Sequence, residues 1–198
     1  PPARAFCAAQ RIASAEPMKE PDPERRYLPA AGNLFIGTFD GMSATKDPMK
    51  ATRFGMTFGR EPLRLTGYYR YQSGGDITDE NNQLVVPARR DSCNIYAVLY
   101  ETDDEVECLY GDNVLTSPNL VAVALVDRPE ETDVYKKFDV EFEYRKSYDP
   151  QKSKEFKYKL AVVFTSSRDG GRFRGAVGSK LWIDDVEVVC REPLAGEQ

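Results

Sequence analysis

The octapeptide Phe138-Asp139-Val140-Glu141-Phe142-Glu143-Tyr144-Arg145 decides the fold class of this chain. Its even positions are apolar or aromatic, and its odd positions are charged. Successive side chains of a β-strand point to opposite faces, so this alternation predicts a strand with one buried and one solvated face. We therefore expect the stretch to lie at the surface of an antiparallel sheet.

The same period of two recurs along most of the chain. It predicts strands over residues 4–9, 33–39, 63–71, 93–101 and 154–164. Residues 120–126 are apolar throughout, which predicts a strand covered on both faces. Turn-forming clusters separate these runs, and no long stretch carries a helical face. The pattern predicts an all-β chain folded as an antiparallel β-sandwich or barrel.

The last predicted strand contains a change of phase. Leu181 and Ile183 are apolar at odd positions, whereas Val186 and Val188 are apolar at even positions. Both pairs point inward only if one extra residue lies between them, so we expect a β-bulge near Asp184-Asp185.

One segment shows no strand pattern. Residues 16–29 hold four prolines and many charges, and are expected to form a long loop.

Composition limits the classes of function. The chain has 198 residues, which favours one domain over residues 1–198. Its net charge of −5 makes nucleic acid and anionic lipid poor partners. It contains no histidine, which excludes Ser-His-Asp catalysis and His-ligated zinc. No apolar run approaches the roughly 18 residues needed to span a bilayer.

The cysteines form no metal-binding or redox motif. Cys7, Cys93, Cys108 and Cys190 are widely spaced and include no CxxC pair. Each lies in a strand-like run, so we expect buried free thiols, with disulfide bonds in one of three pairings as the alternative.

Several segments together resemble a known family. They are AAGNLFIG at 30–37, FGREP at 58–62, LTGYYRY at 65–71, CNIYAVL at 93–99 and FRGAVGSKLWIDDVE at 173–187. This set is similar to the family called the putative carbohydrate metabolism domain, and the resemblance runs from about Ala5 to Arg191.

The resemblance implies more than the periodicity does. It implies a jelly-roll sandwich similar to galactose-binding-type carbohydrate modules, within a secreted or surface protein of glycan-degrading Gram-negative bacteria. It also implies an extracytoplasmic location, at the cell surface or in the periplasm, with a lipid anchor on a segment upstream of this chain. The family supplies no agreed catalytic residues.

Candidate ligand-binding residues lie opposite the apolar faces of their strands. Sugar recognition uses flat aromatic rings beside planar polar groups that bind hydroxyls. If their strands share one sheet, the residues of such an exposed platform are Tyr68, Tyr96, Tyr100, Trp182, Arg64 and Arg70. The alternative is that these rings are ordinary half-buried sheet residues.

Asp184 and Asp185 are the candidate metal ligands. Carbonyl oxygens released at a bulge and two neighbouring carboxylates could hold a structural calcium ion. The alternative is a solvated acidic pair, because calcium takes about six to eight oxygen ligands. No carboxylate pair stands out as a glycosidase acid and base among the 32 acidic residues.

Three functions follow as expectations. The first is a non-catalytic carbohydrate-binding or accessory module, with a polysaccharide or oligosaccharide as its partner. The second is a glycoside-processing enzyme that uses two carboxylates with pKa values pushed apart. The third is a structural domain that binds another surface protein through an apolar patch or a free edge strand.

Overall fold

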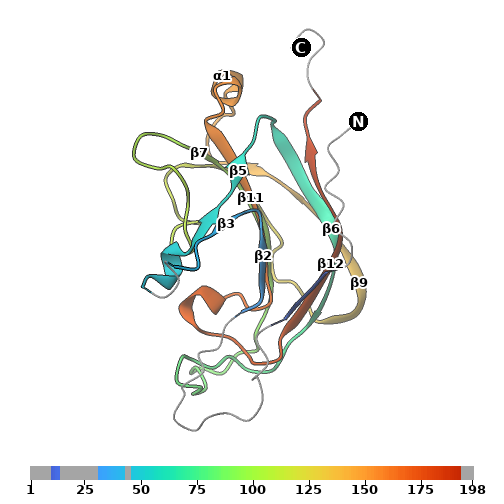
Figure 1. The fold of residues 1–198 in the computed structure, drawn as a ribbon. Coiled ribbons are helices and arrows are strands. Elements are labelled where there is room, and N and C mark those ends of the chain that lie inside the picture. Colours follow the sequence, from blue (N-terminus) through green and yellow to red (C-terminus); the bar gives the residue numbers. More distant parts are fainter. Residues whose placement is uncertain (1–9, 14–30, 43–45, 193–198) are drawn as a thin grey trace.

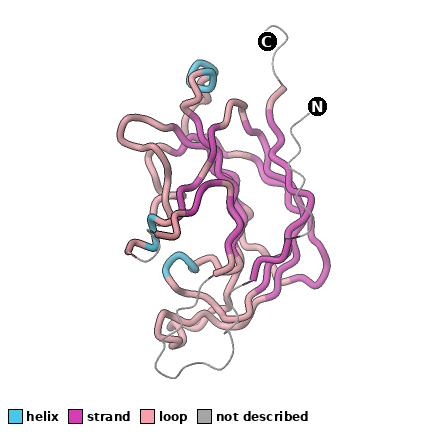
Figure 2. Tube along the Cα trace, in the orientation of Figure 1, coloured by secondary structure: helices cyan, strands magenta, loops and turns pink. Residues whose placement is uncertain are grey.

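The chain folds into two antiparallel β-sheets that pack face to face (Figures 1 and 2). The computed structural model describes residues 10–13, 31–42 and 46–192. The front sheet has the strand order β1 (Gln10–Ala13), β12 (Lys180–Cys190), β6 (Pro62–Gln72) and β9 (Thr132–Glu141). The back sheet has the order β10 (Glu143–Tyr144), β8 (Leu120–Leu125), β7 (Asn94–Glu101), β11 (Tyr158–Thr165) and β2 (Asn33–Phe35), and β5 (Met56–Thr57) also pairs with β11.

Other described elements are short. β3 (Gly37–Phe39) and β4 (Thr52–Phe54) form a separate hairpin. The helical segments are α1 (Pro150–Lys154) and the 3₁₀ turns η2 (Pro48–Lys50) and η3 (Gly170–Arg172). The prediction of antiparallel sheets with almost no helix is confirmed, while the jelly-roll topology stays a prediction. None of the described helices has the length and apolar character to cross a membrane.

One apolar core fills the space between the sheets. The front sheet contributes alternate residues of β6 and β12, and the back sheet contributes alternate residues of β7 and β11. These positions are Leu65, Tyr69, Tyr71, Leu181 and Ile183 from the front, and Ile95, Ala97, Leu99, Tyr158, Leu160, Val162 and Phe164 from the back. Complete burial of such a side chain contributes about 1.5–3 kcal/mol, so this core stabilises the sandwich.

A second apolar cluster covers the other face of the back sheet. Tyr96, Val98 and Tyr100 of β7 pack there against residues of the hairpin and of the β7–β8 connection, namely Phe54, Leu109 and Val114. The Tyr100 hydroxyl donates a hydrogen bond to the carbonyl oxygen of Phe54 at 2.5 Å. The strands β7 and β11 and most of β8 are therefore buried on both faces. The unbroken apolar run at 120–126 predicts this for β8, where Leu125 is the exception at 41% exposed.

The alternating stretch at 138–145 passes from one sheet to the other. β9 ends at Glu141 in the front sheet, and β10 begins at Glu143 in the back sheet. Phe142 lies between them, and its N–H donates to the carbonyl oxygen of Leu63 at 2.9 Å. Phe138 and Phe142 are both buried in the common core. The alternation continues through this corner because both sheets face the same core.

The predicted strand over residues 154–164 is wrong at its start. Asp149 caps α1 by accepting a hydrogen bond from the N–H of Gln151 at 2.8 Å, and Pro150 favours the first helical position. These local signals form a helical turn, and β11 begins only at Tyr158. Phe156 has φ of +56° and is 69% exposed, so it does not share the buried face of β11.

Some predictions fall outside the described residues. The strand at 4–9, the loop at 16–29 and Cys7 lie there. The three described cysteines are free thiols, and burial raises the pKa of Cys93 to about 12. The predicted strand at 33–39 is divided at Ile36 into β2 and β3, which pair with different neighbours.

Gly67 of β6 makes room for the ring of Phe138 on β9. A Cβ atom at position 67 would lie 2.6 Å from Cζ of Phe138 and 3.2 Å from the carbonyl oxygen of Asp184. The Gly67→Val variant is therefore expected to lose about 1–3 kcal/mol of stability through overpacking. Urea unfolding measures this loss, with Gly59→Ala as the control because the atom nearest to a Cβ there, Oγ of Ser153, lies 4.0 Å away. Equal stability of parent and Gly67→Val would contradict the prediction.

Candidate functional site

The outward face of the front sheet carries the candidate site. Leu181 and Ile183 of β12 point into the core, so Lys180 and Trp182 point away from it. The register places Lys180 opposite Gln72 and Trp182 opposite Arg70 on β6. These four side chains form two adjacent rows across two neighbouring strands.

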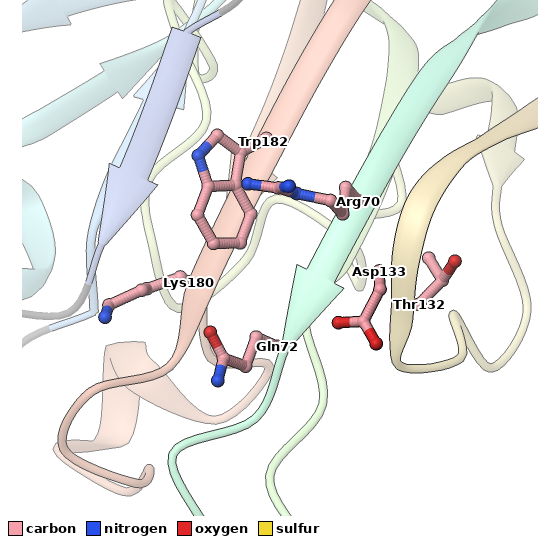
Figure 3. Close-up of a pocket in the computed structure, with 6 residues that line it drawn as sticks. All are labelled: Arg70, Gln72, Thr132, Asp133, Lys180 and Trp182. Carbon is pink, nitrogen blue, oxygen red and sulfur yellow. The ribbon is translucent and has the colours of Figure 1, made fainter.

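An open depression of about 250 Å³ lies over these rows (Figure 3). We call it the front depression, and its lining residues are Arg70, Gln72, Thr132, Asp133, Lys180 and Trp182. Of these lining residues, Thr132 and Asp133 come from the start of β9. Pockets that enclose drug-sized ligands measure about 300–1,000 Å³, so this smaller, open site suits one unit of a longer polar ligand.

Arg70 lies over the aromatic ring of Trp182, with its Cζ atom 3.9 Å from the ring centroid (Figure 3). This is a cation–π contact, and it holds the guanidinium in place. The Nε atom of Arg70 is buried and has no hydrogen-bond partner among the described residues. One face of the indole is therefore occupied by Arg70, and Trp182 acts there as a support for the guanidinium.

Hydrogen bonds between the sequence neighbours of lining residues fix one end of the depression. Ser73 follows Gln72, and its N–H donates to the carboxylate of Glu131, the neighbour of Thr132, at 2.7 Å. Arg90 pairs with both oxygens of Glu131 at 3.0 and 3.1 Å, and these hydrogen bonds lower the pKa of Glu131. The ends of β6 and β9 are thereby joined beside the depression.

The buried side chain of Asp91 also stabilises this end of the depression through hydrogen bonds. It is 3% exposed and accepts hydrogen bonds from the hydroxyls of Ser167 at 2.5 Å and Ser179 at 2.7 Å, and from the N–H of Ala176 at 3.0 Å. Ser179 directly precedes Lys180 and also accepts from the N–H of Gly74 at 3.0 Å. The buried carboxylate thus connects the β6–β7 loop to the start of β12.

Four of the predicted platform residues share this face, and two of them line the depression. Arg70 and Trp182 line the depression, and Tyr68 lies one outward position along β6, where it is 39% exposed. Arg64 lies further along the same strand, where its guanidinium bonds to Asp139 at 2.7 Å and to Glu141 at 3.0 Å. Arg64 is therefore neutralised locally and lies outside the depression.

Tyr96 and Tyr100 do not belong to the platform, so that part of the prediction is wrong. Both lie on β7 in the back sheet, where they are 5% and 0% exposed under the β7–β8 connection. Burial raises the pKa of both hydroxyl groups above the usual tyrosine range. Neither ring offers a free face for a ligand.

The bulge at Asp184-Asp185 is present. The β6–β12 register shifts between Asp184 and Glu187, and Asp185 has φ of +47°. Asp184 pairs in register with Tyr68 beside the depression. Within the described ranges, no group of three or more His, Cys, Asp or Glu side chains is placed to hold a metal ion. Calcium at Asp184 and Asp185 stays a prediction from the sequence.

Sequence reasoning missed Gln72, Lys180, Thr132 and Asp133. Gln72 and Lys180 are in phase with Arg70 and Trp182, so extending the two alternating patterns by one step finds them. Thr132 and Asp133 carry no such signal, because the pairing of β9 with β6 joins residues 60 or more positions apart.

Comparison with known proteins gives one family and several structures. The model of a family described as "Putative carbohydrate metabolism domain" matches residues 13–189. A putative glycoside hydrolase from Bacteroides thetaiotaomicron shares 46% identity and a TM-score of 0.80 over 84% of this chain. A second, from Bacteroides vulgatus, shares 42% identity and a TM-score of 0.75 over 82% of this chain. No curated protein matches.

The two similar structures are longer than this chain. The matched region spans 49% of the first structure's chain and 65% of the second's. The likeness therefore concerns one part of each of those proteins.

Proposed function

This chain belongs to the putative carbohydrate metabolism domain family, and on that premise we propose that it is a non-catalytic carbohydrate-binding module whose site is the front depression. The observation that carries the proposal is the lining itself, which gathers planar and hydroxyl-bearing polar side chains beside the indole ring of Trp182. Such groups bind sugar hydroxyls and the C–H surfaces of sugar rings. The proposal includes a secreted or cell-surface parent protein, which rests on the family resemblance.

The openness of the site supports binding along a chain of sugars. The depression lies on a sheet face, so a polysaccharide can cross it without threading into an enclosed tunnel. Gln72 and Asp133 are exposed, and Thr132 is half-buried. These side chains can exchange bonds to water for bonds to sugar hydroxyls with little rearrangement. Exposed Tyr68 extends the same face toward the next sugar unit.

Glycoside hydrolysis is the second candidate function. The two similar structures favour it, since each belongs to a putative glycoside hydrolase. Hydrolysis by the two common mechanisms needs two carboxyl groups, about 5–5.5 Å or 6.5–9.5 Å apart. Among the described residues that line the depression, Asp133 is the only carboxylate. This composition supports binding over cleavage at this site.

A glycan array tests the proposal. The parent chain is expected to bind a defined set of glycans, and the Gln72→Ala, Asp133→Ala double variant is expected to bind the same set at least about tenfold more weakly. Phe39→Ala is the matched control, because Phe39 is 62% exposed on β3, outside both large sheets. Release of new reducing ends from bound glycans would favour hydrolysis, and equal binding by the double variant would exclude the depression as the site.

A further inference from the structure

We propose that the front depression selects acidic glycans, in which a sugar carboxylate or sulfate ester pairs with Arg70 and Lys180. The inference rests on the proposed function and narrows its ligand class. Both groups present an anion with oxygen acceptors, so the shared chemistry is that of an anionic sugar substituent.

The charges in the depression are unbalanced. Arg70 and Lys180 are cationic, whereas Asp133 is the one anionic side chain among the described lining residues. Neither cation forms an ion pair within the described part of the chain. Other arginines of the front sheet and its loops do form them, as Arg64 does with Asp139 and Arg90 with Glu131. The front depression therefore places two cations without carboxylate partners side by side in one site.

Arg70 is held ready to accept an anion. Its guanidinium lies over Trp182 at 3.9 Å and is half-buried, and its Nε atom is shielded from solvent without a partner. A guanidinium fixed in this way loses less conformational entropy when it binds. Its planar fork matches the two oxygens of a carboxylate, and such charge-assisted hydrogen bonds are about twice as strong as neutral ones.

Lys180 supplies the second charge on the same face. It lies two residues before Trp182 on β12 and diagonally across from Arg70 in the β6–β12 register. Diagonal neighbours in an antiparallel pair are about 7–8 Å apart, within reach of long side chains. An anionic group placed between them can therefore contact both cations.

Asp133 makes the β9 side of the depression chemically different from the β12 side. It lies on β9, so β6 separates it from Lys180 on β12 (Figure 3). Its carboxylate repels an anionic substituent and accepts hydrogen bonds from sugar hydroxyls. An acidic sugar is thus expected to place its anionic group toward β12 and its hydroxyls toward β9.

Matched glycan pairs test this selectivity by titration calorimetry. The probes are oligogalacturonates with their carboxyl-reduced counterparts, and sulfated galactans with their desulfated counterparts. The parent chain is expected to bind at least one acidic probe at least about tenfold more tightly than its neutral counterpart, and high salt is expected to reduce that preference.

Two variants assign the preference to the depression. Arg70→Gln is expected to lose about tenfold in affinity for the acidic probe and little for the neutral one. Arg64→Gln is the matched control, because Arg64 lies on the same face of the same strand and is already paired with Asp139. It is expected to bind as the parent does.

The outcomes separate the inference from the function on which it rests. A preference for either the carboxylate or the sulfate probes, lost in Arg70→Gln, supports the inference. Equal binding of acidic and neutral probes overturns the inference and leaves carbohydrate binding intact. Binding of no glycan, acidic or neutral, overturns both.

Discussion

Replacement of Asp91 by alanine is expected to lower the free energy of unfolding by about 3–5 kcal/mol. Asp91 is 3% exposed and accepts hydrogen bonds from two hydroxyls and two backbone N–H groups. Alanine provides no acceptor, so these donors remain in a region that water barely reaches. Each buried donor without a partner costs about 1–3 kcal/mol, and relaxation of the two serines reduces the sum.

Thermal unfolding followed by circular dichroism measures this effect. For a chain of this size, the expected loss corresponds to a fall in Tm of about 6–20 °C. Asp91→Asn retains one acceptor oxygen and is expected to lose about half as much. Asp104→Ala is the control, because Asp104 is exposed in the β7–β8 connection. Stability of Asp91→Ala within about 0.5 kcal/mol of the parent would show that this network does not hold the loops together.

Replacement of Trp182 by alanine is expected to weaken glycan binding about 30-fold, which corresponds to about 2 kcal/mol. The indole forms one side of the front depression and supports the guanidinium of Arg70 at 3.9 Å. Its removal frees Arg70 to move and widens the site, so both the shape and the fixed charge are lost. Trp182→Phe keeps a smaller aromatic face and is expected to lose less affinity.

A stability measurement must accompany this binding experiment. Trp182 is half-buried on the outward face of β12, away from the core between the sheets, so Trp182→Ala is expected to remain folded. Phe39→Ala again serves as the control for removal of an exposed ring. Unchanged affinity in a folded Trp182→Ala variant would place the glycan site elsewhere on the molecule.

The strand faces were predictable from local sequence. Alternation correctly assigned Ile95, Ala97 and Leu99 to the core, and the change of phase in β12 correctly located the bulge at Asp184-Asp185. Both signals depend only on the pleat of a single strand, which every residue of that strand shares.

The segment that covers the outer face of the back sheet was not predictable from local sequence. Tyr96 and Tyr100 were assigned correctly to the face opposite the core, but Leu109 and Val114 bury that face from a separate segment of chain. Periodicity within β7 gives the direction of a side chain, whereas its exposure depends on which distant segment packs over it. The partners Thr132 and Asp133 were missed for the same reason, since long-range pairing brings them beside Gln72.

The most direct test of carbohydrate binding at the front depression uses the indole of Trp182. The chain contains one tryptophan, so the single indole N–H signal in its ¹⁵N NMR spectrum reports on this site alone. Titration with a glycan that binds in the array is expected to shift this signal saturably, with the Kd that calorimetry gives. A glycan that binds by calorimetry and leaves the indole signal unmoved would contradict the assignment of the front depression as the binding site.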